Sequence, residues 1–244
     1  MKLISRALFL KTLLASLALL PEAMALGRPV NQLRGDIVGW TRLKTSSPWW
    51  QRHSRSDPEL MRFIREQTTL NLDPQWYSAD VENLAEMSKY PLLFSQSIQM
   101  VKDVPGQGNL AEYVRRGGFL LVDACCNRDI NPDFDVFLRQ HIDALAALLP
   151  EAQVRELPSN HDVYRCFFPI PDGHPPHTFY SNVYDPNKAR HGLYSVMIGS
   201  RMAGLISLSG LQCGWDHMVA PAGNDVACMR MLVNIYIYAM TQGA

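Results

Sequence analysis

The stretch that decides the fold is residues 117 to 127, Gly-Gly-Phe-Leu-Leu-Val-Asp-Ala-Cys-Cys-Asn. A glycine pair can end a helix, and the four apolar residues after it are typical of a strand that is buried on both faces. Asp123, Cys125 and Cys126 come directly after this strand. Ligands of open α/β sheets bind beyond the carboxyl ends of the strands, so we expect a site at these three residues.

Strand patterns recur on both sides of this stretch. We expect strands within 32–43, 71–82, 90–94, 119–122, 193–198 and 202–208. The last two are separated by Gly199, Ser200 and Arg201, which is typical of a hairpin turned at glycine.

Helical patterns alternate with the strands. Asp57 before Pro58 predicts a capped helix start, and Asn109 with Glu112 forms a capping-box pattern before Gly117. Two amphipathic or apolar segments, 131–149 and 225–240, complete the set of expected helices. His141 lies on the apolar stripe of the first of these and is expected to be a hydrogen-bonded core residue.

This alternation predicts one three-layer α/β domain. Its sheet is expected to be mostly parallel, with an antiparallel hairpin at one edge. No glycine- or serine-rich linker divides the chain and no internal repeat is present.

The first 25 residues have the pattern of a secretory leader. Cationic residues precede an apolar run at 12–20, and Ala23-Met24-Ala25 is a small-x-small cleavage site. The run of nine residues is shorter than the roughly 20 that a membrane span requires. The flanking sequence resembles the twin-arginine consensus, with Ala7 in place of the second arginine, so the export route stays open. We expect cleavage after Ala25, a mature domain of 26–244 without a membrane span, and a periplasmic or otherwise exported bacterial protein.

Charge and cysteine content restrict the function classes further. Removal of the leader leaves 20 basic and 22 acidic residues, and a net charge of −2 offers no footprint for nucleic acid or anionic membrane. The five cysteines are Cys125, Cys126, Cys166, Cys213 and Cys228. An odd count leaves at least one thiol unpaired within the chain, and Cys228, in an apolar helix, is expected to be that buried thiol.

Two interpretations of the other thiols remain open. A disulfide from Cys125 or Cys126 to Cys213 would clamp the 213 loop onto the sheet of an exported protein. Alternatively, Cys125 or Cys126 is a nucleophile, with His161 as its base and Asp123 beside it. Glycines do not flank the cysteines, as they would in a nucleophile elbow.

Other chemistries have weaker support. A metal site would draw on the same cysteines with His161 or His217, but no CxxC or HExxH spacing is present, and no metal is expected. GxGxxG, Walker and GxSxG patterns are also missing, so no cofactor is expected. Asp123 and Asp216 are a further candidate acid/base pair.

Several motifs together resemble a known bacterial family, the domain-of-unknown-function family 4159, over residues 36–241. The resemblance rests on Tyr90-Pro91-Leu92-Leu93, Gly117-Gly118-Phe119-Leu120 with Asp123-Ala124-Cys125-Cys126, His161-Asp162-Val163, Cys213-Gly214-Trp215-Asp216 and 234–238. It implies a flavodoxin-like sheet similar to class I glutamine amidotransferases and ThuA-like proteins, without an established activity. The amidotransferase triad does not carry over, because His217 is followed by Met218 and Val219 and not by a His-x-Glu motif. The ThuA-like resemblance implies a carbohydrate-type ligand.

The sequence therefore supports two hypotheses for one pocket at the carboxyl ends of the strands. In the first, the protein is a ligand-binding or assembly module of the cell envelope with structural cysteines. Cys213, Trp215 and Asp216 bind a small molecule or envelope protein partner, and Trp215, with Trp49 or Trp50, offers a stacking surface for a sugar or that partner. In the second, it is a cysteine-dependent hydrolase or transferase, acting on a carbohydrate-type substrate.

Overall fold

The computed structural model describes residues 38–124, 133–171, 173–175, 192–216 and 223–241. All of them lie in the second of two compact units, residues 36–244. None of the helices in this described part of the chain is both long and apolar enough to span a bilayer.

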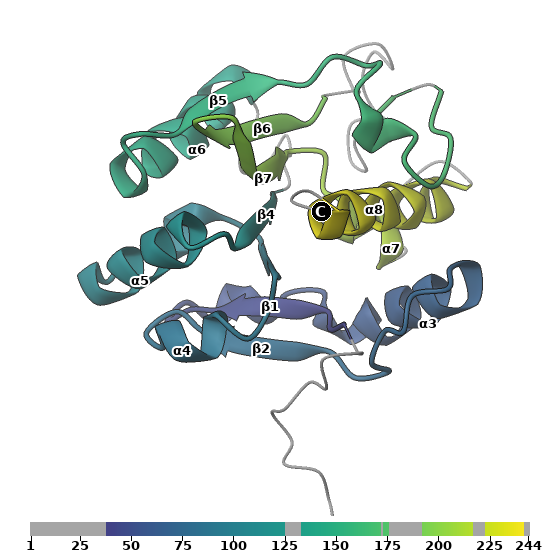
Figure 1. The fold of residues 1–244 in the computed structure, drawn as a ribbon, viewed down its shortest axis with the longest axis horizontal. Coiled ribbons are helices and arrows are strands. Elements are labelled where there is room, and N and C mark those ends of the chain that lie inside the picture. Colours follow the sequence, from purple (N-terminus) through teal and green to yellow (C-terminus); the bar gives the residue numbers. More distant parts are fainter. Residues whose placement is uncertain (1–37, 125–132, 172, 176–191, 217–222, 242–244) are drawn as a thin grey trace, which may run out of the picture. The chain divides into compact units, whose positions relative to one another are not determined.

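A mostly parallel sheet forms the middle layer of this unit (Figure 1). Its strands within the described residues are β1 (Thr41–Lys44), β2 (Tyr77–Asp80), β3 (Leu92–Ser95), β4 (Phe119–Asp123), β5 (Gln153–Glu156), β6 (Tyr194–Ile198) and β7 (Arg201–Ser207). They lie in the order β2-β1-β3-β4-β7-β6-β5, and the first five are parallel. These five reproduce the flavodoxin order 2-1-3-4-5, with β7 in the fifth place. Strand β6 pairs antiparallel with both β7 and β5, which confirms the antiparallel extension at one edge.

Helices cover both faces of the sheet (Figure 1). They are α3 (Asp57–Gln67), α4 (Leu84–Met87), α5 (Val104–Arg115), α6 (Phe134–Leu148), α7 (Leu211–Trp215) and α8 (Asn224–Thr241). Short 3-10 turns occur at η1 (Pro48–Gln51), η2 (Ser54–Ser56), η3 (Ile98–Met100) and η4 (Asp162–Tyr164). Helices α3 and α8 lie on one face and α4, α5 and α6 on the other, so the predicted three-layer α/β fold is confirmed.

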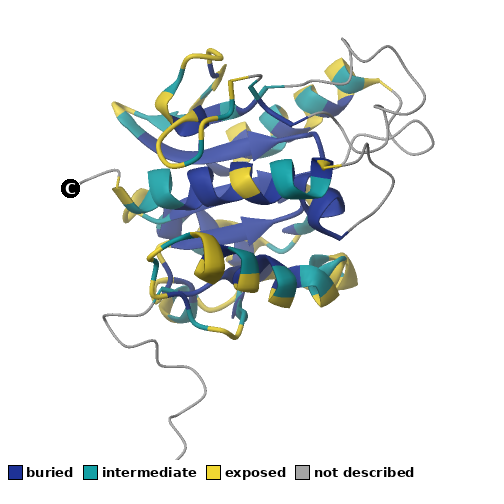
Figure 2. Ribbon diagram, turned by 90° about the vertical axis from the view of Figure 1, so that its right-hand side faces the viewer, coloured by how far each residue is buried: buried dark blue, intermediate teal, exposed yellow. Residues whose placement is uncertain are grey.

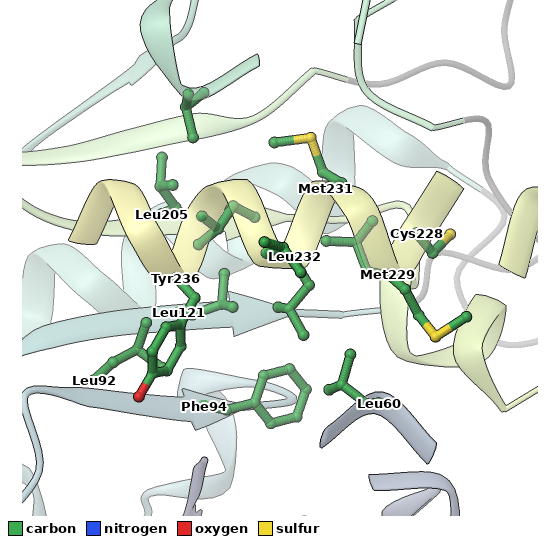
Figure 3. Packing of buried hydrophobic residues seen from close by; sticks show 14 of the residues in the cluster. Leu60, Leu92, Phe94, Leu121, Leu205, Cys228, Met229, Met231, Leu232 and Tyr236 are labelled. Carbon is green, nitrogen blue, oxygen red and sulfur yellow. The ribbon is translucent and has the colours of Figure 1, made fainter. Parts of the chain in front are cut away.

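The central strand β4 is buried along its whole length, as its sequence predicts (Figure 2). Gly117, with φ of 106°, allows the chain to leave α5 in a left-handed conformation that other residues rarely adopt. Leu121 of β4 and Leu205 of β7 point toward Leu232 and Tyr236 of α8 (Figure 3). Helix α8 is apolar nearly all round because one side packs on the sheet and others contact α3, α7 and η4.

The structure corrects three local predictions. Helix α5 begins at Val104 and is capped by Asp103, whose Oδ1 accepts the Gly106 N–H at 2.6 Å, and not by Asn109. The segment 153–156, where no strand was expected, is the edge strand β5, so β7 lies in the sheet interior beside β4. The expected loop at 211–215 is the short helix α7.

Other local predictions are confirmed. His141 is buried and its Nδ1 donates to the Phe137 carbonyl oxygen at 2.9 Å, as expected of a core histidine. Edge strand β2 and strand β6 lie within the expected ranges. The predicted β6–β7 hairpin is present, with β7 beginning one residue early, at Arg201.

Two glycines offer a matched test of this packing. A Cβ at Gly204 of β7 would overlap the Leu120 carbonyl of β4, whereas one at Gly108 of α5 would meet nothing within 4 Å. We expect Gly204→Ala to lower the free energy of unfolding by about 1–3 kcal/mol, through overpacking. Gly108→Ala should raise it by about 0.5–1 kcal/mol, because alanine favours the helix. Urea unfolding of both variants measures these changes; equal effects would contradict the described β4–β7 contact.

Candidate functional site

The candidate site lies where the chain changes direction across the sheet. From β1 the chain crosses to β2 through α3 on one face, and from β3 it crosses to β4 through α5 on the other (Figure 1). Ligand sites of open α/β sheets form at such a switch point, beyond the carboxyl ends of the strands. Here the segments at that place are 45–56, after β1, and 96–97, after β3.

Asp123, at the end of β4, holds helix α7 at this edge. Its Oδ1 accepts the Leu211 N–H and its Oδ2 accepts the Gln212 N–H, each at 2.9 Å. The Gln212 side chain donates back to the Asp123 carbonyl oxygen at 3.1 Å. Because the first N–H groups of a helix lack partners within the helix, this carboxylate both satisfies them and determines where α7 lies.

The environment of Asp123 also changes its ionisation. Burial raises the pKa of Asp123 to about 7, although the N–H groups of Gln212 and Leu211 and the Ser207 hydroxyl donate to the carboxylate. Ser207, at the end of β7, also contacts His174 Nε2 at 3.1 Å. A chain of hydrogen bonds thus runs from His174 through Ser207 and Asp123 to α7.

A second buried charge holds the segment after β1. Arg42 of β1 forms a bidentate ion pair with Asp57, the first residue of α3, at 2.5 and 2.6 Å. Trp40 Nε1 donates to the same carboxylate at 2.9 Å. Asp57 was expected to cap its own helix, but its side chain makes no capping bond and serves this pair instead.

The same guanidinium group fixes the following loop. Arg42 Nη1 donates to the carbonyl oxygens of Trp50 and Arg52 at 3.3 and 3.1 Å. Gln96, after β3, donates from Nε2 to the Arg52 carbonyl oxygen at 2.7 Å and to Gln212 Oε1 at 2.9 Å. Gln96 therefore connects the loop after β1 with α7.

This loop presents His53 to α7. Among the described residues other than glycine, His53 alone has a positive φ, 61°. Its Nδ1 lies 2.5 Å from Asp216 Oδ2, and its Nε2 lies 3.9 Å from Cys213 Sγ. The three side chains form a Cys–His–Asp arrangement in which one imidazole lies between a thiol and a carboxylate. That is the geometry of an activated nucleophile with an oriented base.

The electrostatics of the group match this geometry. Burial by itself would lower the pKa of His53, but hydrogen bonds to Cys213 and Asp216 outweigh it, and the pKa is raised. Burial by itself would raise the pKa of Asp216, but hydrogen bonds from Ser56, His53 and Arg55 outweigh it, and the pKa is lowered. Asp216 is therefore a carboxylate that accepts the His53 Nδ1–H, which leaves Nε2 to exchange a proton with Cys213.

The structure brings together part of the site that the sequence predicts. Asp123, Cys213 and Asp216 meet around α7. Cys125 and Cys126 lie outside the described residues, so their role as candidate nucleophiles stays a prediction. The same holds for the disulfide from either of them to Cys213. Among the described cysteines no disulfide is formed, and Cys228 is the buried thiol that was expected.

His161 does not join this group. Its Nδ1 accepts the Val163 N–H at 3.2 Å, and its ring lies 5.3 Å from that of Tyr238. Tyr238 is near the end of α8, whereas Cys228, near its beginning, lies against Gly214 of α7. Ten helical residues separate the two positions, about 15 Å along the axis.

The position of Trp215 contradicts its expected role in a ligand-stacking surface. Its ring is fully buried and packs against Trp40 and Phe94, with ring centroids 6.1 and 6.0 Å apart. It is a core residue that anchors α7, and no ligand can stack on it. Trp49, one of the two other tryptophans considered, is 56% exposed.

Sequence reasoning missed His53, Arg42 and Gln96. The available signal was their position: His53 follows the first parallel strand and Gln96 follows the next one in the sheet, so both belong to the carboxyl edge. Within the part of the chain that the structure describes, no group of three or more His, Cys, Asp or Glu side chains is arranged to hold a metal ion.

The fold and the site define an α/β protein with a flavodoxin-like sheet and a Cys–His–Asp group at its switch point. Residues 40–240 match the profile of the family described as Domain of unknown function (DUF4159), so the chain belongs to that family, as its motifs suggest. A search of curated proteins finds no match.

The raised pKa of His53 predicts a pH-dependent stability. Protonated His53 is favoured in the folded state, so its contribution is complete below the unfolded pKa of 6.5 and is lost as pH rises through the folded pKa. We expect the difference in free energy of unfolding between wild type and His53→Gln to fall from pH 6 to pH 9. Urea unfolding across this range measures it.

His161 provides the matched control. Burial lowers its pKa, so the difference between wild type and His161→Gln should rise with pH through 6.5. A His53→Gln difference that is constant with pH would contradict the described contacts.

Proposed function

We propose that the protein is a cysteine-dependent acyl hydrolase or transferase. Its nucleophile is Cys213, its general base is His53 and its orienting carboxylate is Asp216. The observation that carries this proposal is the single imidazole that lies within hydrogen-bond reach of Asp216 on one side and of Cys213 on the other.

The chemistry follows from this arrangement. His53 Nε2 takes the proton of Cys213, and the thiolate attacks the carbonyl carbon of an ester, thioester or amide. A carbon–sulfur bond forms, the bond to the leaving group breaks, and His53 returns the proton to the leaving group. Water or another acceptor then attacks the thioester and gives its proton to His53, and Cys213 leaves as the thiolate. Asp216 holds His53 in the required tautomer and stabilises its charged form.

This assignment differs from one based on Cys125 or Cys126 with His161. The position of His161 beside Tyr238 argues for His53 as the base. Cys213 and Asp216 both belong to the α7 segment, so one short element carries the nucleophile and the orienting group.

A ligand-binding role in the cell envelope is the second candidate. The exposed ring of Trp49, with the Arg52 guanidinium 5.0 Å from its centroid, favours it, because exposed aromatic rings bind carbohydrate-type ligands by stacking. In that case Cys213 would be structural, and its loss would leave binding intact.

Acylation by p-nitrophenyl acetate tests the catalytic role. We expect a burst of nitrophenol, an acyl group on the Cys213 peptide by mass spectrometry, and no burst in Cys213→Ala. His53→Gln and Asp216→Asn should each slow acylation by about 10²-fold or more.

Cys166→Ala is the control, because Cys166 contacts the Asn234 carbonyl oxygen, away from α7, and its burst should equal that of wild type. Cys125→Ala and Cys126→Ala test the other candidate nucleophiles. A burst that survives in Cys213→Ala and disappears in one of these two would overturn the assignment.

Export is proposed together with this function, from the leader pattern at 1–25. Full-length protein produced in a Gram-negative bacterium should appear in the periplasm with Leu26 as its first residue, and Ala25→Asp should block cleavage. N-terminal sequencing of the two cell fractions measures this. Cytoplasmic protein that begins at Met1 would contradict it.

A further inference from the structure

The loop that presents His53 is cationic. Residues 48–56 contain Arg52, His53 and Arg55 and no acidic residue. The next carboxylate, Asp57, is buried and paired with Arg42. The mature chain has a net charge of −2, so this local excess of positive charge stands out from the average surface.

Arg52 extends from a backbone position that buried groups hold in place. Its carbonyl oxygen accepts hydrogen bonds from Arg42 and Gln96, both of which are buried. Its guanidinium group stacks over the exposed ring of Trp49. It forms no ion pair with an acidic side chain of the described residues. A fixed backbone and a stacked side chain pre-organise the charge, which lowers the entropy cost of binding an anion.

Arg55 lies beside the catalytic group and faces solvent. Its Nε and Nη2 lie 3.3 and 3.5 Å from the two oxygens of Asp216, yet its side chain is 84% exposed. Asp216 also accepts hydrogen bonds from His53 and Ser56. A guanidinium group has five N–H donors, so this contact leaves donors of Arg55 for a ligand.

We propose that Arg52 and Arg55 bind an anionic group, of the carboxylate class, on the acyl substrate of this site. The proposal rests on the proposed acyl-transfer function and names its substrate class. Guanidinium groups match carboxylates through paired hydrogen bonds, and both arginines come from the loop that carries the base. An anionic acyl chain bound there would have its carbonyl group near His53 and Cys213.

Two esters with the same leaving group test this proposal. We expect wild-type protein to hydrolyse mono-4-nitrophenyl succinate with a kcat/KM about tenfold or more above that for 4-nitrophenyl acetate. Arg52→Gln and Arg55→Gln should each lower this preference by about fivefold or more, and Arg52→Gln should act through KM. Sodium chloride should reduce the preference, because it screens exposed charges.

Arg62→Gln is the matched control. Arg62 of α3 is also exposed, but it pairs with Glu59 and Glu66, so the preference should equal that of wild type. Equal kcat/KM values for the two esters, or a preference that persists in both arginine variants, would overturn the proposal.

Failure of this proposal is distinguishable from failure of the proposed function. Turnover that depends on Cys213 without a preference for the succinyl ester overturns the anion site alone. If turnover does not depend on Cys213, a titration with succinate still tests the anion site. The fluorescence of the tryptophan near Arg52 reports the binding. Saturable binding in wild type that is weakened at least fivefold in Arg52→Gln supports the anion site, and unchanged or undetectable binding overturns it.

Discussion

The buried ion pair between Arg42 and Asp57 is the interaction on which the site depends. Removing both charges from water is costly, and the cost is offset only because every polar atom of the pair has a partner. Trp40 Nε1 donates a further hydrogen bond to the Asp57 carboxylate. The Trp50 and Arg52 carbonyl oxygens accept hydrogen bonds from the Arg42 guanidinium group. One residue of β1 thereby joins the strand, the start of α3 and the loop after β1. Without Arg42, the Trp50 carbonyl oxygen would lose its hydrogen bond from the guanidinium group.

A second buried carboxylate has the same role on the other side of the site. Asp123 orients α7 through two backbone N–H groups, as Arg42 orients the loop through two carbonyl oxygens. Gln96 then contacts both the loop and α7. His53 and Cys213 are 160 residues apart in the chain. They lie close together because buried, hydrogen-bonded polar groups fix the position of the segment that carries each of them. The site is therefore supported by groups that are themselves buried and satisfied, which suits a catalytic arrangement.

Particular residues show where prediction from sequence succeeds. The apolar run 119–122 predicts a strand that is buried on both faces, and the structure confirms it as part of the central strand β4. Asp103 and Asn109 show where it fails. Both residue types can cap a helix, and the local pattern does not tell that Asp103 is the cap and that Asn109 lies inside the helix. The prediction for Trp215 is wrong for a related reason. A tryptophan in a polar loop pattern is expected to be exposed, but α7 directs the Trp215 ring toward Trp40 and Phe94.

The sequence by itself determined the family, the alternation of strands and helices, and the edge of the sheet at which Asp123, Cys213 and Asp216 lie. The alternation and the sheet edge follow from local periodicity and from the rule that parallel strands end together, whereas the family follows from the resemblance of particular motifs. Only the tertiary structure decided that His53, and not His161, is the histidine beside Cys213. Both histidines lie in polar segments of the sequence. The segment of His53 is held by Arg42 and Gln96, whereas His161 packs against the far end of α8. Such contacts join residues far apart in the chain, and no local pattern encodes them.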